Sequence, residues 1–199
     1  MFIKVCGLRT PVDVATAVAA GADAVGFVFA RSVRRVDVPT ARELAALVPD
    51  SVLTVGVFAD VPAAEAAQLA TAAGVRAIQL HGDYPRAAFD EVAATSLTLI
   101  RATTLTPQTD VAVGAFGEDL LLLDAPVPGA GQTWDLTLLE RAQPQGKWVL
   151  AGGLNPDNVG AAIRAARPWG VDVSSGVESA RGVKDPERIR RFVAAARAV

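Results

Sequence analysis

The residues best suited to chemistry stand near the two ends of this chain. Residues 4–7 (KVCG) close the first apolar segment with the ammonium group of Lys4 and the chain's only thiol, that of Cys6. Residues 171–176 (VDVSSG) close the last apolar segment with a carboxylate, two hydroxyl groups and a glycine. Thiols and carboxylates transfer protons, and bare backbone N–H groups at a short helix start bind anions such as phosphate. The two segments predict an enzyme.

Alternation along the predicted strands indicates which polar side chains share a face, because every second residue of a strand points to the same side. Polar residues on the inner face of a barrel are costly to bury without partners, and a site that uses them explains their presence. An ion pair between Lys4 and Asp172 that serves only packing explains those two residues equally well. The pairs predicted to share a face are Lys4 with Cys6, Gln79 with His81, Leu122 with Asp124, and Asp172 with Ser174.

Short β-branched or apolar runs recur at intervals of roughly 20 to 30 residues, the size of one strand and helix unit of a (β/α)8 barrel. A doubly wound open sheet would carry a GxGxxG turn after its first strand, and the segment after Cys6 lacks it. We therefore expect an α/β fold, a single (β/α)8 TIM barrel domain over residues 1–199, with its chemistry at the carboxyl ends of the strands. The predicted strands are Phe2–Cys6, Ala24–Val28, Leu53–Phe58, Ala77–Leu80, Leu97–Ala102, Leu120–Asp124, Trp148–Ala151 and Val171–Ser174.

Helices are predicted between the strands, because several segments begin with a capping side chain and a proline at the first helical position. The last helix places Ile189, Phe192 and Val193 on one apolar stripe. Its arginines fall on the opposite side, which indicates a solvated face rather than a binding patch. The predicted helix starts are Thr10-Pro11, Thr106-Pro107, Asn155-Pro156 and Asp185-Pro186.

Composition narrows the function class. The chain has 199 residues, of which 51% are hydrophobic and 20% charged, enough apolar material for one globular core. A net charge of −2 disfavours nucleic acid and anionic membranes as partners. A sole cysteine cannot form an intrachain disulfide, no leader segment precedes the first strand, and no apolar run reaches the roughly 20 residues that span a bilayer. We expect a cytoplasmic protein.

Short motifs spread along the chain carry a family signal. They are KVCGL from Lys4, GADAVGF from Gly21, VGVF from Val55, QLHG from Gln79, LLD from Leu122, GGLNP from Gly152, and residues 171–178 followed by GVKD from Gly182. In this order, over essentially the whole chain, they resemble the phosphoribosylanthranilate isomerase family. The resemblance implies an Amadori rearrangement of N-(5-phosphoribosyl)anthranilate to the carboxyphenylamino-deoxyribulose 5-phosphate, the third step of tryptophan biosynthesis. It implies no cofactor and no metal.

The resemblance also implies the catalytic pair, with Asp124 as the general acid and Cys6 as the general base. An aldose-to-ketose rearrangement protonates the ribose ring oxygen, opens the ring to a Schiff base and removes a proton from the neighbouring carbon. A positive neighbour such as Lys4 or Arg9 is expected to lower the pKa of the Cys6 thiol toward neutrality. The alternatives are an inert buried thiol and an aspartate that caps the following loop.

The implied substrate carries an anion at each end. A phosphate site is expected where the seventh and eighth strands end, at Gly152, Gly153, Ser174, Ser175 and Gly176.

The anthranilate carboxylate calls for an arginine, and residues 31–36 (RSVRRV) supply candidates. The family pattern of serine, one residue and arginine selects Arg34, whereas counting from Phe29 without a gap selects Arg35.

Residues 125–135 are rich in glycine and proline, and we expect them to close over the site as a lid. His81, the only histidine, is expected to line the site rather than to act as a base.

Two alternative functions stay open: another phosphate-binding barrel isomerase or epimerase that acts on a sugar phosphate, and a non-catalytic barrel that serves as a binding module. A monomer and a homodimer are equally compatible with the sequence.

Overall fold

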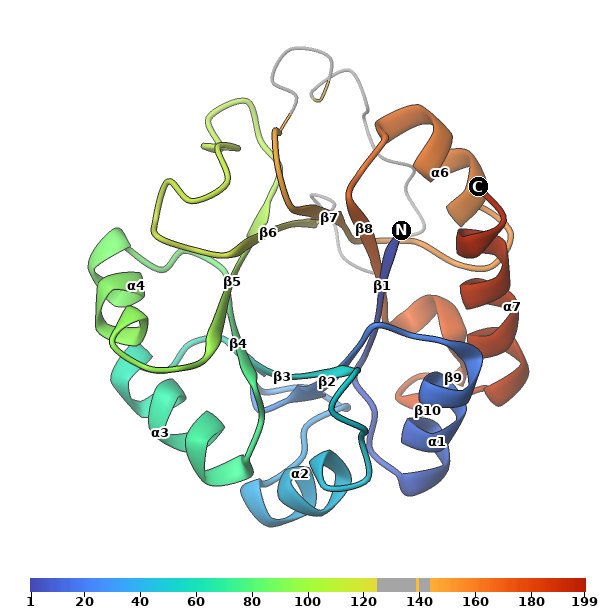
Figure 1. The fold of residues 1–199 in the computed structure, drawn as a ribbon, viewed down its shortest axis with the longest axis horizontal. Helices are drawn as coiled ribbons and strands as arrows, with labels where there is room; N and C mark the ends of the chain where they lie inside the picture. Colours follow the sequence, from blue (N-terminus) through green and yellow to red (C-terminus); the bar gives the residue numbers. More distant parts are fainter. Residues whose placement is uncertain (125–138, 140–143) are drawn as a thin grey trace.

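The structure is a computed structural model that describes residues 1–124, 139 and 144–199. Eight parallel strands close into a barrel in the order β1-β2-β3-β4-β5-β6-β7-β8, which confirms the predicted TIM barrel (Figure 1). The predicted strands match the observed ones to within two residues at each end. The barrel strands are β1 (Phe2–Cys6), β2 (Ala24–Val28), β3 (Leu53–Phe58), β4 (Ala77–His81), β5 (Thr98–Thr104), β6 (Leu120–Asp124), β7 (Trp148–Leu150) and β8 (Gly170–Val173).

Helices surround the barrel on its outside (Figure 1). Several neighbouring helices pack on one another, and α1 and α7 lie side by side, so the last helix meets the first. Between β8 and α7 the chain forms the short 3-10 helix η1 (Ser175–Val177) and a two-stranded hairpin of β9 (Glu178–Ala180) and β10 (Val183–Lys184). The described helices are α1 (Pro11–Ala20), α2 (Val38–Ala45), α3 (Ala63–Ala73), α4 (Arg86–Ala93), α6 (Val159–Ala166) and α7 (Pro186–Arg197).

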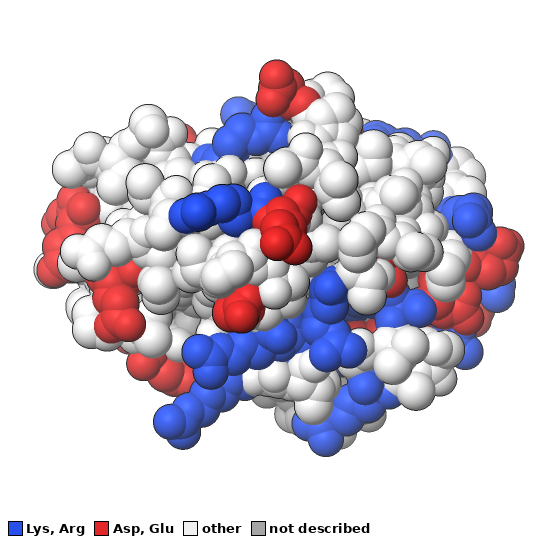
Figure 2. Space-filling model, turned by 90° about the horizontal axis from the view of Figure 1, so that it is seen from below, with Lys and Arg blue, Asp and Glu red and all other residues white. Residues whose placement is uncertain are grey.

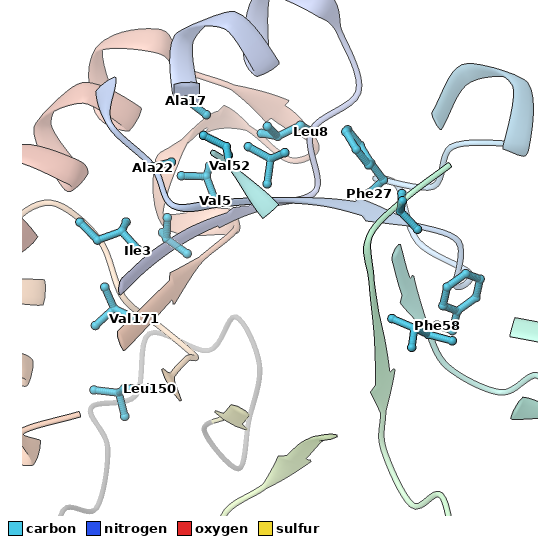
Figure 3. Packing of buried hydrophobic residues seen from close by; sticks show 14 of the residues in the cluster. Ile3, Val5, Leu8, Ala17, Ala22, Phe27, Val52, Phe58, Leu150 and Val171 are labelled. Atoms are coloured by element: carbon cyan, nitrogen blue, oxygen red, sulfur yellow. The ribbon is translucent and has the colours of Figure 1, made fainter. Parts of the chain in front are cut away.

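Two hydrophobic clusters hold the barrel together, one on each side of the strands. The larger lies between the strands and the helices, where Ile3 and Val5 of β1 pack near Ala17 of α1 (Figure 3). The smaller fills the barrel interior and includes Cys6. Because successive residues of β1 fall alternately into the two clusters, the predicted alternation is confirmed for this strand, and Lys4 faces inward with Cys6.

The strand registers arrange the inward side chains in levels, because the strands of an eight-stranded barrel tilt and shift by about one residue per strand. Alternate strands contribute to each level. From the mouth downward the levels are Val28, His81, Asp124 and Ser174; then Cys6, Val57, Ala102 and Ala151; then Gly26, Gln79, Leu122 and Asp172; then Lys4, Val55, Ile100 and Val149. Cys6 therefore lies one level below Asp124.

Two of the four predicted helix starts are confirmed and one is displaced. Thr10 caps α1 and Asp185 caps α7, each by accepting hydrogen bonds from backbone N–H groups of the first turn. The start predicted at Asn155 is wrong, because the Asn155 side chain caps a turn instead and accepts a hydrogen bond from the Asn158 backbone N–H at 3.1 Å. The regular helix α6 begins only at Val159.

The helix predicted from Thr106 is absent, since residues 105–119 join β5 to β6 without a helix. Contacts with the side chain of Arg101 hold this segment in place instead of helical hydrogen bonds. The buried Arg101 guanidinium pairs with Glu118 at 2.7 Å and donates to the Asp110 carbonyl oxygen at 2.8 Å. A proline signal for a helix start is local, and an arginine from the neighbouring strand overrides it here.

The outer surface carries charges of both signs, as the face in Figure 2 shows. Ile189, Phe192 and Val193 of α7 are buried, which confirms the predicted stripe. The α7 arginines are exposed as predicted, and two of them also pair with acidic residues of other elements: Arg191 with Asp157 at 2.8 Å and Arg197 with Asp23 at 2.7 Å. Among the described helices, none combines the length and apolar character of a membrane span.

Candidate active site

A cavity of about 430 Å³ opens at the carboxyl ends of β6, β7 and β8. It brings together most of the residues that the sequence singled out, although they come from distant parts of the chain. Cys6 and Gly176 are not part of its wall. The lining residues are Arg34, Asp124, Ala151, Gly152, Gly153, Leu154, Asp172, Val173, Ser174, Ser175 and Arg181.

Cys6 lies beneath the mouth of the barrel, and its side chain is buried with 7% of its surface exposed. The thiol packs against Gly26 of β2, where a Cβ atom would come within 2.8 Å of the Cys6 Sγ atom. Glycine at this position therefore makes room for the sulfur. Ala102 and Ala151, which share the level of Cys6, carry small side chains and belong to the same buried cluster as the thiol.

Burial raises the pKa of the Cys6 thiol, and repulsion by the Asp172 carboxylate raises it further. Attraction to the Lys4 and Lys184 ammonium groups lowers it by less. The prediction of a lowered pKa is therefore wrong for the protein without substrate, because desolvation and the Asp172 carboxylate together outweigh the cations. The charged groups that act most strongly on the thiol are Lys4, Asp172 and Lys184, whereas the Arg9 guanidinium donates to the backbone carbonyl oxygens of Val33 and Gly182.

The predicted contact between Lys4 and Asp172 is present, with the Lys4 Nζ atom 3.0 Å from the Asp172 Oδ1 atom. Burial lowers the pKa of Lys4, but attraction to Asp172 and Cys6 outweighs that effect and leaves the pKa raised. Asp172 also lines the cavity, so the pair does more than fill the barrel interior. It places a carboxylate at the floor of the site.

Glu178, in β9, is the centre of a charged network that sequence reasoning did not assign. Its carboxylate accepts hydrogen bonds from Arg34 Nε at 2.6 Å, Arg34 Nη2 at 2.8 Å, the Gly182 backbone N–H at 2.9 Å and Lys184 Nζ at 3.0 Å. Burial by itself raises the pKa of Glu178, but these donors lower it to about 2. The only signal in the sequence was that residues 178 and 182–185 belong to the family motifs.

Of the two candidate arginines, Arg34 lines the cavity, whereas Arg35 lines two other surface hollows. Gly7 makes the path of Arg34 possible, because its φ of 76° suits glycine and a Cβ atom there would lie 2.7 Å from Arg34 Cδ. Hydrogen bonding to Glu178 raises the pKa of Arg34 and occupies its Nε and Nη2 atoms. The described contacts thus leave Nη1 as the nitrogen for a ligand.

Of the residues predicted to bind phosphate, four line the cavity and one does not. Gly152, Gly153, Ser174 and Ser175 line the cavity, and both glycines have positive φ values of 84° and 66°, a conformation that side chains disfavour. Gly176 packs the other way, because a Cβ atom on it would lie 1.8 Å from a backbone carbonyl oxygen of the loop after β7. Its role is to let η1 approach that loop.

Comparison with known proteins assigns the family. A model of the family described as N-(5'phosphoribosyl)anthranilate (PRA) isomerase matches residues 3–195. The chain belongs to this family. An N-(5'-phosphoribosyl)anthranilate isomerase from Symbiobacterium thermophilum is 43% identical over 100% of this chain and 99% of its own length.

Solved structures agree with this family. The crystal structure of TrpF from Jonesia denitrificans is 51% identical, with a TM-score of 0.93 over 100% of this chain and 98% of that one. A phosphoribosyl anthranilate isomerase in complex with reduced 1-(o-carboxyphenylamino)-1-deoxyribulose 5-phosphate is 32% identical, with a TM-score of 0.85 over 100% of both chains.

Two further predictions, on His81 and on the lid, and one residue that was not predicted concern the mouth of this phosphoribosylanthranilate isomerase family member. His81 ends β4 at the mouth level, half-buried and outside the lining of the described cavity. Arg181, which the sequence analysis did not select, is exposed and lines the cavity from the β9–β10 turn. The predicted lid, residues 125–135, lies outside the described residues.

Proposed function

We propose that this protein converts N-(5-phosphoribosyl)anthranilate to 1-(2-carboxyphenylamino)-1-deoxyribulose 5-phosphate by an Amadori rearrangement. The family match over residues 3–195 carries the proposal. The cavity supports it, because the barrel registers put a thiol one level below a carboxyl group that lines the cavity wall. The family match also favours this reaction over another sugar-phosphate isomerase or epimerase and over a non-catalytic binding module.

General acid and general base groups are enough for this reaction. In its protonated form, Asp124 donates a proton to the ribose ring oxygen as the ring C–O bond breaks and the nitrogen lone pair forms the Schiff base. The Cys6 thiolate then removes the proton from the adjacent carbon, and that electron pair forms the enolamine. Protonation of the first carbon and loss of the proton from the hydroxyl group of the second carbon then yield the ketose. The half-buried position of Asp124 in the cavity wall suits a proton donor better than a cap of the following loop.

The two ends of the substrate are assigned to different residues of the cavity wall. We assign the phosphate to Gly152, Gly153, Ser174 and Ser175, with Gly176 supporting the turn, because loops after the seventh and eighth strands of such barrels bind phosphate. The anthranilate carboxylate is assigned to Arg34. The relative solved with a reduced carboxyphenylamino-deoxyribulose phosphate supports a ligand with these two anionic ends.

The proposed function also bears on the domain number, the cellular compartment and the oligomeric state of the protein. We propose that residues 1–199 form one barrel domain, and that the free Cys6 thiol works in the reducing cytoplasm. The sequence left a monomer and a homodimer open, and a dimeric phosphoribosylanthranilate isomerase from Thermotoga maritima exists among the similar proteins. Sedimentation at assay concentration distinguishes the two states.

A steady-state assay with phosphoribosylanthranilate tests the proposal on the native chain, on Cys6→Ser and on Asp124→Asn. We expect each variant to lose at least about a hundredfold in kcat, the usual contribution of a positioned acid or base, while a product analogue still binds. Asp90→Asn, an exposed position on α4, is the matched control and should keep full activity. Native-like turnover by Cys6→Ser and Asp124→Asn would refute these roles, and an inactive native chain would refute the function.

A further inference from the structure

Lys184 is a buried lysine that the catalytic scheme leaves without a role. It comes from β10 of the C-terminal hairpin, and 1% of its side-chain surface is exposed. Its Nζ atom lies 2.8 Å from the Ser174 carbonyl oxygen, 3.4 Å from Ser174 Oγ and 3.0 Å from Glu178 Oε1. One ammonium group therefore contacts both a predicted phosphate residue and the carboxylate that holds Arg34.

The charged groups around Cys6 do not balance when the thiol is protonated. Lys4 of β1 and Asp172 of β8 form one pair, and Lys184 of β10 and Arg34 of the loop after β2 share the single carboxylate of Glu178. Cations therefore exceed carboxylates by one in this group. Ionisation of Cys6 would supply the missing negative charge inside a region that water barely reaches.

The other elements packed around the thiol add no ionised group on its own level. The β2 neighbour is Gly26, and the side chains at the level of Cys6 on β3, β5 and β7 are apolar: Val57, Ala102 and Ala151. Asp124 lies one level higher and acts as a neutral acid in the proposed scheme. The charge that stabilises or disfavours the thiolate thus comes from the groups named above.

We propose that Lys184 is a positioning residue that stabilises the Cys6 thiolate during catalysis and, through Ser174 and Glu178, ties the phosphate side of the cavity to Arg34. This inference rests on the proposed function only for the role of Cys6 as base. Attraction to Lys184 lowers the pKa of Cys6, whereas burial and Asp172 raise it. Burial lowers the pKa of Lys184 itself, and Glu178 offsets this lowering only in part; Glu178, whose pKa is about 2, stays ionised beside the lysine at neutral pH.

Replacement of Lys184 is expected to leave the fold intact, so its effect on the thiol can be measured separately. Without the lysine, the Glu178 carboxylate keeps three donors, from Arg34 and the Gly182 backbone, which anchor the hairpin. Lys184→Met keeps the length of the side chain and removes its charge, and Lys184→Arg restores the charge. Lys147→Met is the matched control, because Lys147 is exposed and lies near the Trp169 ring.

The test is the titration of Cys6, followed by the ultraviolet absorbance of the thiolate in the full chain, with Cys6→Ser as the blank. Because Cys6 is the only cysteine, the signal reports one group. We expect Lys184→Met to raise the titration midpoint by about one pH unit, the lower range for loss of a nearby opposite charge, and to lower kcat/KM near neutral pH about tenfold. Lys184→Arg should recover most of both, and Lys147→Met should change neither.

Separate outcomes distinguish the failure of this inference from the failure of the proposed function. A folded Lys184→Met protein with an unchanged thiol titration would overturn the role of Lys184, whatever its activity. If Lys184→Met does not fold, as judged by circular dichroism, Lys184→Gln supplies the same comparison. A native chain that does not turn over phosphoribosylanthranilate would refute the proposed function while the thiol titration still measured the effect of Lys184.

Discussion

Replacement of Glu178 by glutamine is expected to make the stability of the protein less sensitive to acid. In the folded state Arg34, Lys184 and the Gly182 backbone hold the Glu178 carboxylate ionised, with a pKa of about 2 against an ordinary value of 4.5. Because the folded pKa lies below the unfolded one, the folded state binds fewer protons. The stabilisation is therefore complete above about pH 4.5 and is lost as the pH falls toward 2.

The size of the effect follows from the separation of the two pKa values. From 4.5 to about 2, at about 1.4 kcal/mol per pKa unit, the carboxylate contributes about 3 kcal/mol before screening. Arg34 lines the cavity with 21% of its side-chain surface exposed, so solvent and salt reduce this contribution. We expect a measurable share of about 1 to 2 kcal/mol.

Urea unfolding of the native chain and of Glu178→Gln, at about pH 5 and about pH 3, measures this share. Between these pH values the free energy of unfolding of the native chain should fall by about 1 to 2 kcal/mol more than that of Glu178→Gln. At about pH 5 the variant is the less stable protein, because two cations lose their counter-ion. Glu187→Gln on α7 is the control, since Glu187 is exposed and its pair with Arg190 spans 3.4 Å. Equal acid sensitivity of the native chain and Glu178→Gln would refute the reasoning.

Two further predictions concern the carboxylate site and the loop after β5. Arg34→Met should lower kcat/KM for phosphoribosylanthranilate at least about tenfold, because a charge-assisted hydrogen bond is lost, whereas Arg35→Met should leave it unchanged; the opposite result in steady-state kinetics would favour Arg35. Arg101→Met leaves Glu118 buried without its partner, which costs about 3 to 5 kcal/mol and lowers Tm by about 10 °C in thermal unfolding. Adding Glu118→Leu should recover most of that loss, and a drop below about 2 °C for Arg101→Met would contradict the importance of the pair.

The sequence by itself determined the architecture of this protein and the positions of the two residues proposed as its catalytic pair. Strands such as Phe2–Cys6 and Leu120–Asp124 have the predicted bounds, because β-branched and apolar runs with turn residues at their ends are local signals. The alternation of inward and outward residues along β1 is equally local, since it depends only on the geometry of an extended chain. From these, the contact of Lys4 with Asp172 followed once the first and last strands were taken as neighbours.

The tertiary structure alone decided the electrostatics of the site. Arg34 and Glu178 are 144 positions apart, and no local pattern predicts that a carboxylate from a short hairpin would occupy two nitrogens of the arginine proposed to bind the substrate carboxylate. The direction of the Cys6 pKa shift could not be predicted from the sequence either, because it depends on how completely the closed barrel removes water from the thiol. The missing helix after Thr106 has the same origin: Arg101, from the adjacent strand, supplies contacts that outweigh a local start signal. Burial and long-range pairing set these properties, and both arise only when the barrel closes.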